Sequence, residues 1–185
     1  VLGWAFAVLA ATMLVPVFFA IALDTIVHVQ AFTVPAIAIG FVGGCMIIAF
    51  RGRDRFSGRK QSLLLLALIW TLVPAAAALP FYTTGFPGSA VAAYFEATSG
   101  LTTTGATVIT NPGETPASVI VWRAMLQWIG GFMTLVALAA LLGPLSGSVI
   151  EDRQLRLVGQ STQGTLQQLR EAIATIFPLY SALTA

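Results

Sequence analysis

Charged residues are scarce in this sequence and make up only 9% of its 185 positions. A soluble domain carries roughly 25% charged residues, so an ordinary soluble fold is excluded. Hydrophobic residues account for 57% of the chain instead. We therefore predict an integral membrane protein of the all-α class.

The chain has a single histidine and a single cysteine, which excludes several kinds of chemistry. Cys45 cannot form an intrachain disulfide, and its apolar surroundings predict a buried packing residue. His28 has only Asp24 nearby, too few ligands for a metal site, so we interpret both as interfacial polar residues. No histidine or lysine near Ser99 could act as a base, and an enzyme is not expected.

Four segments with little or no charge are long enough to cross a bilayer, which takes ~20 residues. They cover residues 1–23, 32–50, 61–82 and 117–150, and a fifth helix starts near residue 165. The chain has no initiator methionine and stops within the fifth helix, so we expect a fragment of a longer protein.

Prolines and glycines predict local features of these spans. Pro16 is expected to kink the first span, and Pro74 and Pro80 to interrupt the end of the third. Glycines in the second span suit close packing against another helix. These glycines are Gly40, Gly43 and Gly44.

Lysine and arginine are missing from the loops that hold Asp24, His28 and Glu114. Eight of the nine basic residues fall in the two other loops: Arg51, Arg53, Arg55, Arg59, Lys60, Arg153, Arg156 and Arg170. The positive-inside rule makes that side cytoplasmic. Topology explains the cluster at residues 51–60 better than the alternative, binding of anionic lipid or nucleic acid. Membrane lipid is the expected surrounding and nucleic acid is not an expected partner.

The segment between the third and fourth spans includes FEATSGLTTTGATV at residues 95–108. Pro87 and Gly88 indicate a turn, and Ser89 can cap a helix over residues 89–100. About 12 residues at 1.5 Å each give roughly 18 Å, half a membrane. Because the next span must return to the cytoplasm, we predict a re-entrant pore helix that enters from outside.

The four residues Thr102, Thr103, Thr104 and Gly105 follow this helix. Threonine favours extended backbone, which could aim carbonyls and hydroxyls at one axis, and Gly105 can adopt dihedrals that other residues avoid. Neutral oxygens suit a partly dehydrated potassium ion, and the preceding helix end is partly negative. We predict a filter here, with the ion bound by Thr103 and Thr104. The competing interpretation, a phosphate-binding loop, is not favoured because this segment lacks the lysine of that motif.

Glu96 and Arg123 are the ionisable residues at predicted membrane depth. An uncompensated charge there costs a few kcal/mol or more, about 3 on insertion scales, so we expect the two to pair and brace the pore helix. Two alternatives stay open. Glu96 could bind the ion directly, and Arg123 could extend to the outer interface.

Residues 95–108, followed by WRAMLQWIGG at 122–131, resemble the first pore repeat of the Trk/Ktr/HKT potassium transporter superfamily, and within it the membrane subunits of bacterial Trk systems. Phe132-Met133 departs from the family pattern. The resemblance implies a potassium-channel-like fold, a helix–re-entrant pore loop–helix repeat preceded by two transmembrane helices. The expected parts are two leading helices (1–50), a basic cytoplasmic loop (51–60), the first pore repeat (61–143), a cytoplasmic linker (144–164) and a truncated second repeat (165–185).

The function that this resemblance implies is potassium uptake across the bacterial inner membrane, by a symporter or channel-like transporter. The filter would lie at Thr102, Thr103, Thr104 and Gly105, potassium would be the substrate, and no covalent cofactor is expected. Implied partners are a cytoplasmic nucleotide-binding ring protein and a second full-length chain in a homodimer. Four repeats make one pore in this family, so a complete single-repeat chain would have to be a homotetramer. The alternative function is a non-transporting membrane scaffold or assembly subunit.

Overall fold

The computed structural model of the chain describes residues 2–51, 59–147 and 163–184. Every regular element within these ranges is a helix, which confirms the all-α class. The chain divides into two compact units, Val1–Trp128 and Ile129–Ala185. The first unit contains all the residues of the candidate site.

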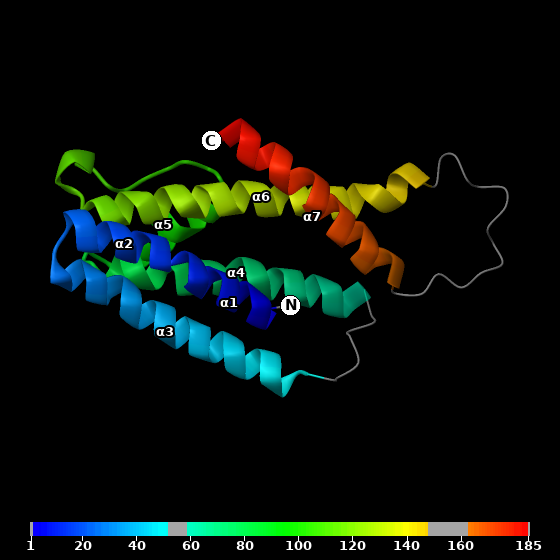
Figure 1. The fold of residues 1–185 in the computed structure, drawn as a ribbon, viewed down its shortest axis with the longest axis horizontal. Helices are drawn as coiled ribbons and strands as arrows, with labels where there is room; N and C mark the ends of the chain where they lie inside the picture. Colours follow the sequence, from blue (N-terminus) through cyan, green and yellow to red (C-terminus); the bar gives the residue numbers. More distant parts are fainter. Residues whose placement is uncertain (1, 52–58, 148–162, 185) are drawn as a thin grey trace. The chain divides into compact units, whose positions relative to one another are not determined.

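The first unit contains five helices, a short 3-10 helix and the start of a sixth helix (Figure 1). They are α1 (Leu2–Thr12), α2 (Leu14–Leu23), α3 (Ile26–Ala49), α4 (Arg59–Thr83), α5 (Ala90–Leu101), η1 (Pro112–Glu114) and α6 (Ala117–Gly147). Helix α7 (Gln163–Thr184) belongs to the second unit, where Phe132 contacts Phe177 edge to face with ring centroids 5.6 Å apart.

Three helical stretches of the described chain are long and apolar enough to cross a membrane: Leu2–Leu23, Ile26–Ala49 and Leu64–Thr83. The multi-pass membrane class is thereby confirmed. Helix α4 begins at Arg59, so the predicted basic loop is shorter than expected and Arg59 and Lys60 start the helix. Helix α6 extends to Gly147, past the predicted end at residue 143, and residues 148–162 of the predicted linker lie outside the described residues.

Proline interrupts the first span but not the third. Pro16 has no N–H to donate to the carbonyl of Thr12, and α1 ends at Thr12 while α2 begins at Leu14. In contrast, α4 continues through Pro74 and Pro80, so the predicted interruption is wrong. Each proline removes only one hydrogen bond, and packing around these buried rings maintains the helix.

Helix α3 also contains a proline, and α4 compensates for it. Pro35 cannot donate to the carbonyl of Ala31, and the Thr83 hydroxyl of α4 lies 2.8 Å from that carbonyl oxygen. The same hydroxyl lies 2.8 Å from the carbonyl of Leu79 in its own helix. This contact holds the end of α4 against the first part of α3.

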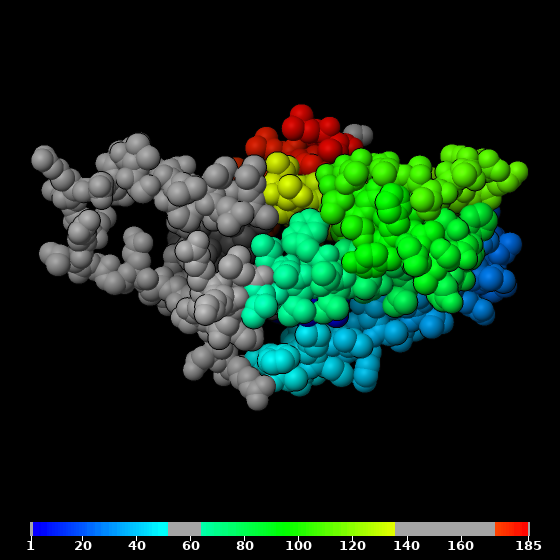
Figure 2. All heavy atoms as spheres, turned by 180° about the vertical axis from the view of Figure 1, so that it is seen from behind, coloured from blue at the N-terminus to red at the C-terminus, as the bar shows by residue number. Residues whose placement is uncertain are grey.

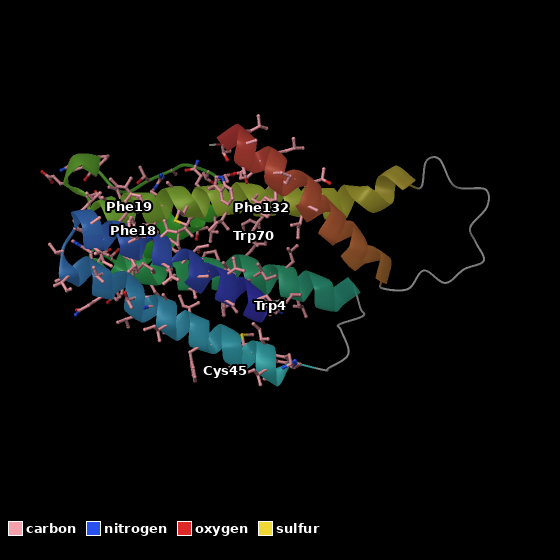
Figure 3. The ribbon with its side chains drawn as sticks, viewed as in Figure 1. Trp4, Phe18, Phe19, Cys45, Trp70 and Phe132 are labelled. Carbon is pink, nitrogen blue, oxygen red and sulfur yellow. The ribbon has the colours of Figure 1, made fainter. Side chains whose placement is uncertain are left out.

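Two of the three predicted packing glycines make a close helix contact. A Cβ on Gly43 would lie 3.0 Å from the backbone oxygen of Gly3 in α1, and one on Gly40 would lie 3.4 Å from Ala10. Gly44 faces open space. Cys45, labelled in Figure 3 near the end of α3, is exposed. The predicted burial of Cys45 is wrong, because the packed face of α3 passes through residues 39 and 43 instead.

One end of the first unit brings together the α2–α3 turn, the end of α4 and the start of α6, at the left of Figure 1. The end of α3 and the start of α4, which flank the arginine-rich segment, lie at the opposite end. Seen from behind in Figure 2, α5 and its loop, in green, form part of the surface beside α4. The α2–α3 turn, which holds Asp24, and the helix ends that flank the arginine-rich segment are thus separated along the helix axes.

Candidate functional site

Helix α5 is capped and packed as its sequence indicates. The Ser89 hydroxyl oxygen accepts a hydrogen bond from the Ala92 N–H at 3.2 Å, which supplies one of the acceptors that a helix start needs. The buried side of α5 includes Ala93, Glu96, Ala97 and Gly100, at the spacing of one helix face. A Cβ on Gly100 would lie 3.0 Å from the Cβ of Leu126 in α6, so glycine is what allows this close approach.

The end of α5 is closed by two backbone hydrogen bonds. The N–H of Thr103 donates to the carbonyl of Gly100 at 3.0 Å, and the N–H of Thr104 donates to that of Ser99 at 3.1 Å. This pairing is a Schellman motif, and it requires a left-handed residue, here Thr103 with φ 56°. The predicted extended backbone is wrong for Thr102 and Thr103, because both residues are used to close the helix.

The threonine hydroxyls after α5 make local hydrogen bonds. The Thr102 hydroxyl donates to the carbonyl of Thr98 at 2.8 Å, and that of Thr103 donates to the carbonyl of Thr102 at 2.7 Å. The Thr102 and Thr104 hydroxyl oxygens lie 2.8 Å apart. Within the described residues, the carbonyl oxygens of Thr103 and Thr104 accept no hydrogen bond. Both residues are exposed, so these two carbonyls remain available to another partner.

Gly105 and Ala106 turn the chain away from the helix end. Gly105 has φ 78°, which agrees with the predicted need for a residue without a Cβ. Its carbonyl accepts a hydrogen bond from Arg123 Nη2 at 3.1 Å. The carbonyl of Ala106 accepts from Arg123 Nη2 at 3.0 Å and from the Ser99 hydroxyl at 2.6 Å. The loop is therefore held from both α5 and α6.

Glu96 is completely buried and both of its oxygens are hydrogen-bonded. Its Oε2 lies 2.8 Å from Nε of Arg123, the pairing expected from the sequence. Its Oε1 accepts from the Thr107 hydroxyl and from the Val108 N–H, each at 2.6 Å. This carboxylate is directed at protein donors on two segments, α6 and the loop after α5, so both of its oxygens are engaged by protein groups.

Asp24 is a functional candidate that sequence reasoning missed. Its Oδ1 accepts from the N–H of Ala117 at 3.1 Å, and its Oδ2 accepts from the N–H of Ser118 at 3.0 Å. These donors start α6, where Pro116 offers no side-chain acceptor. Burial raises the pKa of the Asp24 carboxyl, but donors of Ser118 and Ala117 and the charge of His28 outweigh it and lower the pKa. The sequence offers no signal for this contact, because the two donors lie 93 and 94 residues away from Asp24.

Trp122 joins three helices next to Arg123. Its indole N–H donates to the carbonyl of Ala77 in α4 at 3.0 Å. The ring of Phe32 in α3 meets it edge to face, with centroids 6.2 Å apart. Trp122 and Phe32 are both fully buried, so this contact fixes the rotation of α6 about its axis.

The sequence of the chain is similar to those of known proteins. Residues 28–185 match the TrkH family, described as a cation transport protein. The chain is 31% identical over 127 residues to the Trk system potassium uptake protein TrkH of Escherichia coli K12, covering 68% of this chain and 26% of the relative. It is 33% identical over 152 residues to the protein of that name from Vibrio parahaemolyticus, covering 80% and 30%.

A solved structure is also similar. The crystal structure of the potassium transporter TrkH from Vibrio parahaemolyticus matches with a TM-score of 0.78 at 28% identity, covering 98% of this chain and 36% of that one. The chain spans about a quarter to a third of the length of the curated relatives described above, at 26% and 30%.

Proposed function

Because the chain belongs to the TrkH family of cation transport proteins, we propose that it forms part of a potassium path across the bacterial cytoplasmic membrane. Curated relatives from Escherichia coli and Vibrio parahaemolyticus are named potassium uptake proteins. In this proposal α4, α5 with its loop, and α6 form one pore repeat of four. Helices α1–α3 precede it as leading helices, and α7 begins the next repeat.

The pair of available carbonyls on Thr103 and Thr104 carries the proposal. They follow a helix of 12 residues, about 18 Å long, which suits a half-depth pore helix. The partly negative end of that helix favours a cation, and carbonyl oxygens can replace part of the hydration shell of potassium. We propose that residues 102–105 are the filter segment of this repeat, with Gly105 supplying the turn.

The Glu96–Arg123 pair supports the filter segment in this proposal. Arg123 donates to the carbonyls of Gly105 and Ala106, and Glu96 accepts from Thr107 and Val108. The two charges neutralise one another, so the guanidinium adds little repulsion to a passing cation. The pair thus holds the loop as a rigid cradle without placing a net charge beside the ion.

The orientation in the membrane and the protein partners belong to the same proposal. The end of the first unit that carries Asp24, His28 and Glu114 would face outward, and the arginine-rich segment after α3 would face the cytoplasm. A cytoplasmic nucleotide-binding ring protein would regulate the pore, and two full-length chains would form a homodimer. The family resemblance supports both of these partners.

The proposal is tested by two substitutions at Gly105 in the full-length parent protein. Gly105→Asn and Gly105→Asp both add a side chain that tolerates positive φ, and a Cβ here meets no atom within 4 Å. Only aspartate adds a charge. We expect rubidium uptake to fall at least about tenfold further in the aspartate variant, equivalent to ~1.4 kcal/mol in the barrier.

Growth of a potassium-uptake-deficient strain provides the second readout. The asparagine variant should support growth better than the aspartate variant at low external potassium. If the aspartate variant grew and transported like the unchanged protein, residues 102–105 would not line the path. The alternative function, a scaffold or assembly subunit, would be favoured if biological function were undiminished in a variant that carries Gly105→Asp and in which Thr103 and Thr104 are also replaced.

A further inference from the structure

The start of α6 is held by a residue that lies far away in the sequence. Asp24, in the α2–α3 turn, accepts hydrogen bonds from two successive N–H groups across separations of 93 and 94 residues. The first N–H groups of a helix have no acceptor within the helix itself, and a carboxylate there also interacts favourably with the helix dipole. This contact fixes where α6 begins relative to the α1–α3 hairpin.

A second contact fixes the rotation of α6 one turn further along. Ser118 and Trp122 are four residues apart and lie on one face of the helix, and both are fully buried. The Trp122 indole donates to Ala77 of α4 at 3.0 Å and packs against Phe32 of α3. The capped turn and the tryptophan therefore hold the same face of α6.

The neighbouring face of α6 holds the proposed filter segment. Arg123 follows Trp122 and is turned by about 100° around the helix, and its guanidinium donates to the carbonyls of Gly105 and Ala106. Leu126 lies against Gly100 at the end of α5. A shift of the start of α6 would therefore move both the guanidinium and the surface on which α5 rests.

We infer that Asp24 is a positioning residue for the loop of residues 102–106, acting through the start of α6. The leading hairpin α1–α3, which lies outside the proposed pore repeat, would then help to set ion selectivity. Asp24 itself does not touch the ion. The inference rests on the proposed function for its effect on selectivity, whereas its effect on loop order does not depend on transport.

The test uses the full-length parent protein with three variants. Asp24→Ala removes both acceptors, Asp24→Asn keeps one oxygen that can cap the helix, and Glu114→Ala is the control. Glu114 is an exposed acid at the same end of the unit, and its carboxylate accepts a hydrogen bond from the side chain of Asn111 at 3.2 Å. The control thus removes an equal charge without touching α6.

Two measurements are made on each variant: the ratio of rubidium to sodium uptake in liposomes, and hydrogen exchange of residues 103–108. We expect Asp24→Ala to lower the uptake ratio at least about threefold, or ~0.65 kcal/mol, and to speed exchange. Asp24→Asn should be intermediate and Glu114→Ala unchanged. If Asp24→Ala does not fold, the asparagine variant still has to show a lower ratio and faster exchange.

Unchanged exchange in a folded Asp24→Ala or Asp24→Asn protein would overturn the inference, even if transport were altered. An equal change in Glu114→Ala would overturn it too, because surface charge would then be the cause. Absence of rubidium uptake by the unchanged protein would instead contradict the proposed function, and the exchange measurement would still decide the role of Asp24.

Discussion

At the scale of single residues, Glu96 shows what sequence alone can and cannot predict. A buried charge at membrane depth needs an opposite charge, and Arg123 was the available partner, so the pair could be predicted. The contacts of Glu96 with Thr107 and Val108 depend on the path of the loop, which no residue pattern specifies. Asp24 was missed for the same reason, because its partners are 93 and 94 residues away.

Replacing Glu96 with glutamine should destabilise the fold. The amide group of Glu96→Gln must face either Arg123 or the donors of Thr107 and Val108, so a donor is left opposite a donor. We expect a loss of roughly 3 kcal/mol, the lower end for breaking a buried pair, and reduced uptake. Thermal unfolding in detergent measures it, with the exposed Glu114→Gln as control. Equal melting temperatures for the two variants would contradict the brace.

The cap formed by Asp24 should depend on pH in one direction. The pKa of Asp24 is lowered from its ordinary value of 3.8, so the folded state favours the carboxylate. Its contribution to stability is present above that value and is lost as pH falls through the lower, folded pKa. The melting-temperature difference between the unchanged protein and Asp24→Asn should shrink as the pH falls below about 4. A difference that grows as the pH falls below about 4 would contradict this.

At the scale of helices, the hydrogen bonds that close the end of α5 outweigh the preference of threonine for extended backbone. Three successive threonines predict extended chain, yet Thr102 and Thr103 end α5 because the carbonyls of Ser99 and Gly100 need donors. The glycines of α3 were read correctly as packing residues at 40 and 43. The partner Gly3 and the outward face of Gly44 depend on the rotation of α3 against α1, which the sequence does not encode locally.

Alanine at two adjacent glycines tests the α1–α3 contact. A Cβ on Gly43 would lie 3.0 Å from backbone atoms of Gly3 and Ala7, whereas one on Gly44 meets nothing within 4 Å. Gly43→Ala should therefore destabilise by about 1–3 kcal/mol, and Gly44→Ala should be neutral or stabilise by up to about 1 kcal/mol. Unfolding in detergent compares them. Similar losses in both would show that the helices do not meet through Gly43.

At the scale of the whole molecule, composition and charge placement were informative because they sum over many residues. Scarce charge predicted the membrane class, and long apolar runs predicted spans that the structure contains at Leu2–Leu23, Ile26–Ala49 and Leu64–Thr83. The links between the leading hairpin and α6 could not be predicted, since they are single contacts between distant segments. Asp24 and Trp122 provide two of them.

The proposed orientation can be tested by labelling. In a full-length protein whose Cys45 is replaced by serine, Glu114→Cys should react with a membrane-impermeant thiol reagent added to whole cells. Ser57→Cys, in the arginine-rich segment, should react only after the membrane is opened. The reverse pattern would contradict the positive-inside assignment, and with it the entry of α5 from outside.

The central claim is that the carbonyls of Thr103 and Thr104 bind the transported ion. Crystals of the full-length parent protein grown in rubidium, with anomalous diffraction recorded at the rubidium edge, test it most directly. The account predicts an anomalous peak in contact with the carbonyl oxygens of Thr103 and Thr104, on the side away from Arg123. Peaks elsewhere in the protein, with none beside these two oxygens, would contradict it.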